Sequence, residues 1–414
     1  MQAFAERAFA EQACARYERG RAATRALRRG VRQGCALAKL PRDMIRSLSL
    51  SWSLGNTSLA SCRMERPNRL KRLGQTALRW ALQALVLALT VGTSPLLASQ
   101  MLADVKGRGS LACGVNEGLP GFSFVDERGN WTGFDVDFCR ALAAAIYGDP
   151  NRVRLIPLSA DARFQALRDG KIDVLSRNST WTMSRETEFG LTFVGVTYYD
   201  GQGFMIPRAM RIKSALELDG AKVCVQSGTT TIDNLADFFA SNGMRLEEVV
   251  SSSTDSSIRN YEAGLCSVLT SDLSQLYALR LRLSKPRDHV ILPDVISKEP
   301  LGPVVRDNDL QWIEIVKWVY FAMINAEELG VNSRNIDQAL KSTKPEVMRL
   351  VGTTGNFGEQ IGLTNSWAAN IIRSVGNYGE VFERNLGSKT QLAIPRGLNQ
   401  LWNEGGIQYA PPIR

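Results

Sequence analysis

Polar side chains follow three apolar segments of the chain, and their types suit a zwitterion. They are Asn178, Thr180 and Arg185 after "DVLS" (173–176), Thr229 and Thr230 after "VCVQS" (223–227), and Asp272 after "LCSVLTS" (265–271). A guanidinium can hold a carboxylate through two parallel hydrogen bonds, and hydroxyl groups add neutral donors. A carboxylate accepts hydrogen bonds from an ammonium. Together these groups predict a binding site for an α-amino acid.

Each residue type also has a purely structural interpretation. Asn178 and Thr180 could cap a helix, and Asp272 could be the N-cap of the helix that follows it. Arg185 could pair with Glu186 or Glu188 at the surface. The placement of all of them after strand ends favours the binding site, because open α/β sheets bind ligands beyond the carboxyl ends of their strands.

The pattern of elements predicts two similar α/β halves. Strands are expected at 110–118, 153–159 and 173–176, with a hairpin near 127–130 and a helix from about Asp135. The order then repeats from residue 221, and 309–329 has the apolar period of a helix. Alternating strands and helices indicate mainly parallel sheets flanked by helices. Two crossing strands, near 199–205 and 297–305, would form a hinge between two lobes.

These expectations divide the chain into six parts. They are a basic extension (1–63), a signal peptide (64–98), a first part of lobe 1 (99–204), lobe 2 (205–298), a second part of lobe 1 (299–390) and a wrapping tail (391–414). The segment 331–366 is rich in Asn, Thr and Gly, and the sequence assigns it no role.

Charge is unevenly distributed along the 414 residues. The whole chain carries +9, but residues 1–98 contain 17 Lys and Arg against 5 Asp and Glu, whereas residues 99–414 contain 33 against 36. The predicted globular part is therefore slightly acidic, which excludes nucleic acid as a partner. With a single histidine and no zinc-like cysteine spacing, we expect no metal and no cofactor.

The leader has the build of a secretory signal from Met64 onward. A basic stretch (66–72) precedes an apolar core of about a dozen residues, too short for the roughly 20 of a spanning helix. Small residues follow near Ala98, where we expect cleavage. Residues 1–63 are interpreted as a mis-called start, and the alternative is an arm that binds an anionic surface.

Four cysteines fall in the predicted exported part: Cys113, Cys139, Cys224 and Cys266. An even number in an oxidising compartment predicts two disulfides. Spacing allows three pairings, and we favour Cys113–Cys139 and Cys224–Cys266 because each lies within one predicted lobe. Buried free thiols are the alternative.

Several motifs in fixed order resemble a known family. They include "GFDVDFCRALA", "TWTMSRE", "VQSGTTT", "YEAGLCSVLTSD", "KEPLGPVVR" and "QYAPPIR", and the likeness runs from about residue 104 to 414. The chain resembles the solute-binding proteins of polar amino-acid ABC transporters, and most of all the general L-amino-acid-binding subgroup. The resemblance implies a two-lobe type 2 periplasmic binding protein fold.

The resemblance also implies roles for individual residues. Arg185 would bind the ligand α-carboxylate with help from Thr180, a backbone group near Asn178, Thr229 and Thr230, and Asp272 would bind the α-ammonium. The loop "NEGLPGF" (116–122) would form a side-chain pocket with Asn116 or Glu117, Leu119 and an aromatic wall, Phe122. Trp181 would be a second wall, with core packing as its alternative. Without a fixed acid in that loop to select Lys or Arg, we expect broad specificity for L-amino acids.

The implied protein is a monomeric periplasmic receptor and not an enzyme. It would close around an amino acid and deliver it to an ABC permease driven by an ATPase. Two rivals remain open. One is a cyclohexadienyl or arogenate dehydratase of the same fold, for which Glu117 is the available acid, and the other is a periplasmic amino-acid sensor.

Overall fold

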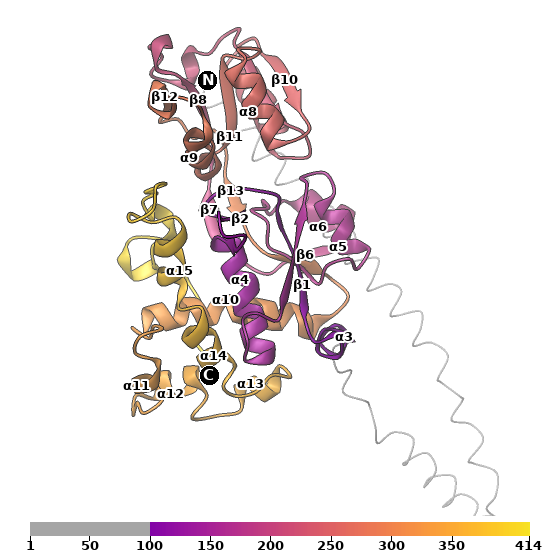
Figure 1. The fold of residues 1–414 in the computed structure, drawn as a ribbon, viewed down its shortest axis with the longest axis vertical. Helices are drawn as coiled ribbons and strands as arrows, with labels where there is room; N and C mark the ends of the chain where they lie inside the picture. The colour runs from indigo at the N-terminus through magenta and orange to yellow at the C-terminus, as the bar shows by residue number, and fades with distance from the viewer. Residues whose placement is uncertain (1–99) are drawn as a thin grey trace, which may run out of the picture. The chain divides into compact units, whose positions relative to one another are not determined.

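The computed structural model describes residues 100–414 (Figure 1). The predicted signal peptide at 64–98 and the predicted extension at 1–63 lie outside the described residues.

The first sheet has the strand order β4-β1-β5-β14-β6. Its strands are β1 (Leu111–Asn116), β4 (Val153–Leu158), β5 (Val174–Leu175), β6 (Leu191–Phe193) and β14 (Val304–Arg306). β1 lies parallel to β4 and to β5, and β14 is antiparallel to both β5 and β6. The carboxyl ends of β1, β4 and β5 therefore meet at one edge of the sheet.

The second sheet repeats this plan with the order β10-β9-β11-β8-β12. Its strands are β8 (Gln202–Pro207), β9 (Lys222–Gln226), β10 (Glu247–Ser251), β11 (Val268–Asp272) and β12 (His289–Ile291). β9 lies parallel to β10 and β11, while β8 is antiparallel to β11 and β12. The predicted α/β class with mainly parallel sheets is confirmed, and each sheet contains one antiparallel strand, β14 in the first and β8 in the second.

Two short strands connect the sheets. β7 (Tyr198–Asp200) pairs antiparallel with β13 (Glu299–Leu301), and the register places Asp200 opposite Glu299. Figure 1 shows this ladder between the strands and helices of the two sheets. A separate hairpin joins β2 (Phe124–Val125) to β3 (Trp131–Thr132), as its turn residues predict.

Helices cover both sheets. Those of the first sheet are α3 (Gln100–Arg108), α4 (Phe134–Tyr147), α5 (Arg163–Arg168), α6 (Met183–Phe189) and α10 (Leu310–Glu328). Those of the second are α7 (Thr231–Ser241), α8 (Thr254–Glu262) and α9 (Leu273–Arg282). Helix ends follow local chemistry: Asp309 accepts from the Trp312 N–H at the start of α10, and Gly148 closes α4 in a left-handed conformation.

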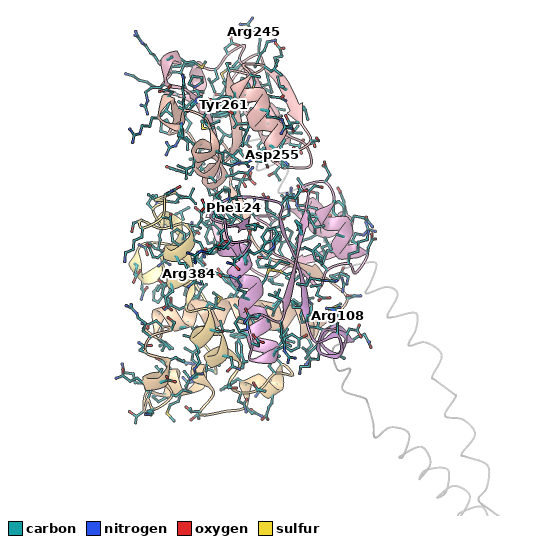
Figure 2. The ribbon with its side chains drawn as sticks, viewed as in Figure 1. Arg108, Phe124, Arg245, Asp255, Tyr261 and Arg384 are labelled. Carbon is teal, nitrogen blue, oxygen red and sulfur yellow. A yellow bond between two sulfur atoms is a disulfide. The ribbon has the colours of Figure 1, made fainter. Side chains whose placement is uncertain are left out.

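Residues 331–390 form a further helical layer. It contains α11 (Ile336–Ala339), α12 (Pro345–Val351), α13 (Phe357–Gln360), α14 (Trp367–Ser374) and α15 (Tyr378–Asn385). The buried face of α14 packs on α4 and α10 in the main hydrophobic core. Arg384 of α15, labelled in Figure 2, reaches Asp137 of α4 at 2.7 Å. Within the segment 331–366, α11 and α12 both contact α14, and α12 also contacts α10. This segment therefore has a structural role in the helical layer.

Two disulfides join neighbouring elements. Cys113 of β1 bonds to Cys139 of α4, with Cα atoms 6.1 Å apart. Cys224 of β9 bonds to Cys266, which precedes β11, with Cα atoms 5.6 Å apart. The favoured pairing is thus the one that the structure contains.

The last residues lie against the strand that leads out of the first sheet. The side-chain amide of Asn399 accepts from the Tyr199 N–H at 2.7 Å and donates to the Tyr199 carbonyl at 3.0 Å. Gln408 is fully buried, contacts Tyr320, and donates to Tyr378 Oη at 3.1 Å. These amides fix residues 397–408 to the hinge strand β7 and to α10 and α15.

Among residues 100–414, no helix combines the length and apolar character that crossing a bilayer requires.

Candidate functional site

A cavity lies where the strand ends of the two sheets face each other. Most of the predicted ligand-binding residues line it: Asn116, Asn178, Thr180, Arg185, Thr229, Thr230 and Asp272. They come from the ends of β1, β5, β9 and β11 and from the first turns of α6 and α7. The fold therefore brings residues up to 156 positions apart into one cavity.

Phe122 and Trp181 lie elsewhere. Phe122 is buried in an aromatic cluster, edge to face with Phe134 and Tyr198 at centroid distances of 6.2 and 5.4 Å. Trp181 is partly exposed and stacks on Phe193 at 5.7 Å. Neither side chain lines the cavity. Apolar packing accounts for both rings in this structure, as the alternative for Trp181 expected, and their predicted roles as walls of a ligand pocket stay predictions.

Arg185 is buried and turned toward the cavity. Its Nη1 donates to the Thr180 carbonyl at 2.7 Å, and its guanidinium lies 5.1 Å from the centroid of the Phe164 ring. Burial lowers the pKa of Arg185, and the negative charges of Glu299 and Asp272 act against that shift. No ion pair with Glu186 or Glu188 forms within the described residues. The surface-pair alternative is thereby removed.

Asp272 occupies the N-cap position of α9, but its side chain makes no capping hydrogen bond. It is 7% exposed and lines the cavity. Burial raises the pKa of Asp272 well above its usual value, and the nearby carboxylates of Asp200 and Glu299 add to the shift. A carboxylate in this position gains most from a cation placed beside it.

Glu299 of the hinge strand β13 is a site residue that the sequence analysis did not identify. It is 1% exposed, and its Oε2 accepts from Thr180 Oγ1 at 2.6 Å and from Thr230 Oγ1 at 2.9 Å. Asn234 and Ser297 donate to its other oxygen at 2.7 and 2.6 Å. One carboxylate thus binds hydroxyl groups from both sides of the cavity.

This network fixes what the two threonines can offer. A hydroxyl carries one proton, and Thr180 and Thr230 direct theirs to Glu299. Toward the cavity their oxygens present lone pairs, which suit an ammonium better than a carboxylate. The resemblance assigned Thr180 and Thr230 to the ligand carboxylate, and those roles stay predictions.

Asn178 is held in an unusual backbone conformation, with φ of 28°. Its N–H donates to the buried Asp135 carboxylate at 2.9 Å. Burial raises the pKa of Asp135 to about 7. The Asn178 side chain accepts from Asn116 at 3.1 Å and donates to Gln275 of α9 at 3.3 Å. Asn178 therefore links the first sheet to the second through a chain of amides.

The Gly-Thr-Thr turn approaches α5 closely. Gly228 has φ of +69°, and a Cβ there would lie 2.0 Å from Asp161 Oδ1. Ser227 donates to Asp161 at 3.1 Å, and Arg163 Nη1 donates to the Gly228 carbonyl at 3.2 Å. Thr229 donates to the Gln226 carbonyl at 2.6 Å. Glycine is needed here for both the left-handed φ and the space.

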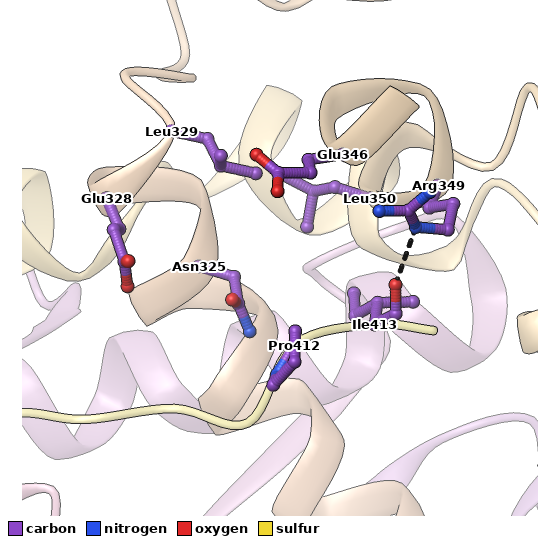
Figure 3. A pocket seen from close by; sticks show the side chains of 8 residues that line it. All are labelled: Asn325, Glu328, Leu329, Glu346, Arg349, Leu350, Pro412 and Ile413. Atoms are coloured by element: carbon purple, nitrogen blue, oxygen red, sulfur yellow. Dashed lines mark hydrogen bonds between the residues drawn. The ribbon is translucent and has the colours of Figure 1, made fainter. Parts of the chain in front are cut away.

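A second cavity is lined by residues near the C-terminal end of the sequence, and none of them lines the first cavity (Figure 3). α10, α12 and the tail form it, and Arg349 Nε donates to the Ile413 carbonyl at 2.8 Å across it. None of the predicted site residues lines it. Within residues 100–414 there is also no group of three or more His, Cys, Asp or Glu that could hold a metal ion.

The family model for bacterial extracellular solute-binding proteins, family 3, matches residues 111–341. The chain belongs to this family. Members of the family are receptors for solutes, so this solute-binding protein is not an enzyme and the dehydratase alternative is dropped.

Individual relatives agree with this assignment. The general L-amino acid-binding periplasmic protein AapJ of Rhizobium johnstonii is 54% identical over 81% of this chain and 98% of its own. The putative amino-acid ABC transporter-binding protein YhdW of Escherichia coli is 52% identical over 77% of this chain and 93% of its own. A solved structure of an ABC transporter periplasmic binding protein from Brucella ovis, with glutathione bound, is 50% identical. It covers 76% of this chain and 99% of its own, with a TM-score of 0.75.

Proposed function

We propose that this solute-binding protein captures free L-amino acids in the periplasm and delivers them to an ABC permease with its ATPase. The observation that carries the proposal is one cavity lined by both Arg185 and Asp272, two buried opposite charges without a direct ion pair. A zwitterion supplies a carboxylate for the first and an ammonium for the second. Thr180 and Thr230 add lone pairs for the ammonium, and the backbone N–H groups at the N-terminus of α7 are donors for the carboxylate.

Binding is proposed to proceed by closure of the lobes predicted at 99–204 with 299–390 and at 205–298. The groups that meet across the cavity are Thr180 with Thr230, Asn178 with Gln275, and Arg163 with the Gly228 carbonyl. A ligand that contacts both sides favours the closed form by the contacts made only there. The ladder of β7 and β13 would carry the motion as the hinge.

The finer parts of the proposal concern export, oligomeric state and the breadth of ligand specificity. We propose that residues 64–98 direct export and are removed, that the protein acts as a monomer, and that it binds a broad range of L-amino acids. N-terminal sequencing of the exported protein tests the first point, and light scattering tests the second. A thermal-shift screen of the twenty amino acids tests the third.

One observation favours a second class of ligand. The relative from Brucella ovis was solved with glutathione, whose γ-glutamyl end carries a free α-ammonium and α-carboxylate. In this chain a wider groove shares Arg185, Thr229 and Thr230 with the cavity. We propose that small peptides with such an end use the same clamp. Glutathione should then compete with an amino acid for a single site in calorimetry.

The clamp itself is tested by calorimetry of Arg185→Ala and Asp272→Ala with several amino acids. Removing one partner of a buried charge contact costs roughly 3–5 kcal/mol, so each change should weaken binding by about 100-fold or more. Arg168→Ala and Asp337→Ala, at exposed positions outside the cavity, are matched controls. Unchanged affinity in both cavity variants would overturn the assignment of these residues.

A further inference from the structure

Tyr199, the middle residue of the hinge strand β7, points both of its backbone groups away from the partner strand β13. The register places Pro300 opposite Tyr199, and a proline has no N–H to donate across the ladder. The Pro300 carbonyl also turns away, since it accepts from the Trp181 N–H at 2.8 Å. Tyr199 and Pro300 thus form a pair that exchanges no hydrogen bonds, and the N–H and C=O of Tyr199 face the outer edge of the ladder.

The C-terminal tail binds that outer edge, and it is itself attached to the helices of the first sheet. Asn399 is 3% exposed, and its side-chain amide binds both backbone groups of Tyr199. Before Asn399, Arg396 pairs with Glu327 of α10, and after it Leu401 is buried in the main hydrophobic core. Tyr199 is therefore held to the helices that cover the first sheet.

The residues that follow Tyr199 are held to the second sheet instead. The Gly201 carbonyl accepts from the Leu273 N–H at 2.8 Å. The Asp200 carboxylate accepts from the Ser274 N–H at 3.3 Å. Leu273 and Ser274 are the first residues of α9, which covers the second sheet. The chain therefore passes from the first sheet to the second at the peptide link between Tyr199 and Asp200.

The other hinge strand, β13, changes its attachment at the same level. On one side, Ser297 Oγ accepts from the Gln202 N–H of the second sheet at 3.3 Å. On the other side, the Gly302 N–H donates to the Ser179 carbonyl, beyond the end of β5 in the first sheet, at 3.1 Å. Glu299 lies between these two contacts, so both strands pass from one sheet to the other at one level of the ladder.

We propose that the hinge turns at the link between Tyr199 and Asp200, and that Asn399 is the positioning residue that places the pivot there. With Asn399 bound, Tyr199 moves with the first sheet and Asp200 with the second, so closure rotates few backbone bonds. Without it, the motion would spread into residues 196–199, and the ligand-free protein would sample more orientations. Closure would then cost more conformational entropy, and every ligand would bind more weakly. This pivot rests on the proposed function, because it acts through closure of the lobes around an amino acid.

Amide hydrogen exchange of the wild-type protein tests where the hinge turns. Asn399 accepts from the Tyr199 N–H on the first-sheet side of the pivot, so this contact should persist in the open form. The Tyr199 amide should therefore exchange slowly even without ligand. Fast exchange at Tyr199 in the ligand-free protein would overturn the pivot, because the tail would then bind the hinge only in the closed form.

Asn399→Ala tests the residue, with Asn377→Ala as a matched control. Asn377 is also buried, accepts from one backbone N–H and donates to one backbone carbonyl, both at 2.9 Å, but neither group lies in a hinge strand. Both variants should lower the free energy of unfolding by a similar amount. Only Asn399→Ala should weaken the binding of L-glutamine and L-leucine alike, by about tenfold, and enlarge the ligand-free protein in small-angle scattering. Equal affinities and scattering curves for the two variants would refute the role of Asn399.

Asn399→Asp serves if the alanine variant does not fold. An aspartate keeps the size of the side chain and the acceptor for the Tyr199 N–H, but it has no donor for the Tyr199 carbonyl. Its affinity and scattering should change in the same direction, and wild-type values would contradict the proposal. If the wild-type protein binds none of the twenty amino acids, the proposed function fails, while amide exchange and scattering of the ligand-free variants still decide the pivot.

Discussion

Thr180 Oγ1 lies 2.6 Å from Glu299 Oε2, a buried contact between residues 119 positions apart. Glu299 sits in the hinge ladder and also accepts from Thr230 at the start of α7. The hinge and both walls of the cavity therefore share one carboxylate, and movement of either wall has to break or form a hydrogen bond to it.

Glu299→Gln should weaken the binding of all amino acids by about tenfold. A glutamine has one acceptor oxygen for four donors, so at least one hydroxyl loses its fixed orientation. Calorimetry gives the affinity, and small-angle scattering with and without ligand gives the extent of closure. Ser297→Ala removes one donor from the same carboxylate without altering a cavity residue, and it should have a smaller effect. Equal, small effects of the two changes would contradict the role of Glu299.

Ligand affinity should rise with pH through the acidic range. Burial, with the charges of Asp200 and Glu299, raises the pKa of Asp272 well above its usual value, so the free protein keeps a proton there to a higher pH than an ordinary aspartate would. The ligand ammonium favours the ionised carboxylate, and binding therefore releases a proton. At pH values below the pKa of Asp272 in the free protein, ligand affinity should fall by up to about tenfold per pH unit.

Calorimetry in buffers of different ionisation enthalpy, between about pH 5 and 8, measures this proton release. Burial also raises the pKa of Asp200 to about 6, so a control is needed to separate the two groups. Asp272→Asn provides it: the weakened binding that remains should lose most of the proton release. Full release in that variant would show that another carboxyl group is responsible.

Gly228→Ala should weaken ligand binding more than it destabilises the fold. Alanine meets a left-handed φ of +69° and an approach of 2.0 Å to Asp161 from the opposite wall. Gly243→Ala is a matched control, because its φ is +65° with no atom within 4 Å. Both variants should lose about 1 kcal/mol of unfolding free energy, and only Gly228→Ala should lose affinity. Loss of affinity in both would refute the close-approach explanation.

Replacing Cys224 and Cys266 by serine should lower the free energy of unfolding by about 4 kcal/mol. The bond closes a loop with a sequence separation of 42, whose freedom in the unfolded chain would be restored. Chemical denaturation measures the change. The shorter Cys113–Cys139 loop, with a separation of 26, should contribute about 3.5 kcal/mol. Identical denaturation curves before and after substitution would contradict the prediction.

Asn178, Arg185, Thr229 and Asp272 could be predicted to lie together. They follow buried strands, and the carboxyl ends of parallel strands meet at the same edge of a sheet. Glu299 could not be located in this way, because it lies within a hinge strand and acquires its partners from residues 69 and 119 positions away. Arg163 was missed for a different reason. It lies on a crossover helix, where an arginine ordinarily faces solvent, and here the approach of the Gly228 turn buries it.

Aromatic residues near the site were the least predictable. The loop that holds Phe122 runs past the start of α4, and the ring packs beside Phe134 and Tyr198.

The repeated strand order could be predicted from the sequence, but the positions of the antiparallel strands β8 and β14 could not. Each of these strands directly follows a hinge strand, β7 or β13, and completes the sheet that the chain then enters. The strands with which β14 and β8 pair depend on where the chain enters each sheet after the hinge, and local sequence patterns do not predict this.

The amide of Asn399 holds both backbone groups of Tyr199, 200 positions earlier in the chain. Every strand of both sheets lies at or before Arg306 and so precedes Asn399 in the chain. Both sheets can therefore form from residues that come before this anchor. The contact between Asn399 and Tyr199 then secures the joint between two lobes that are already assembled.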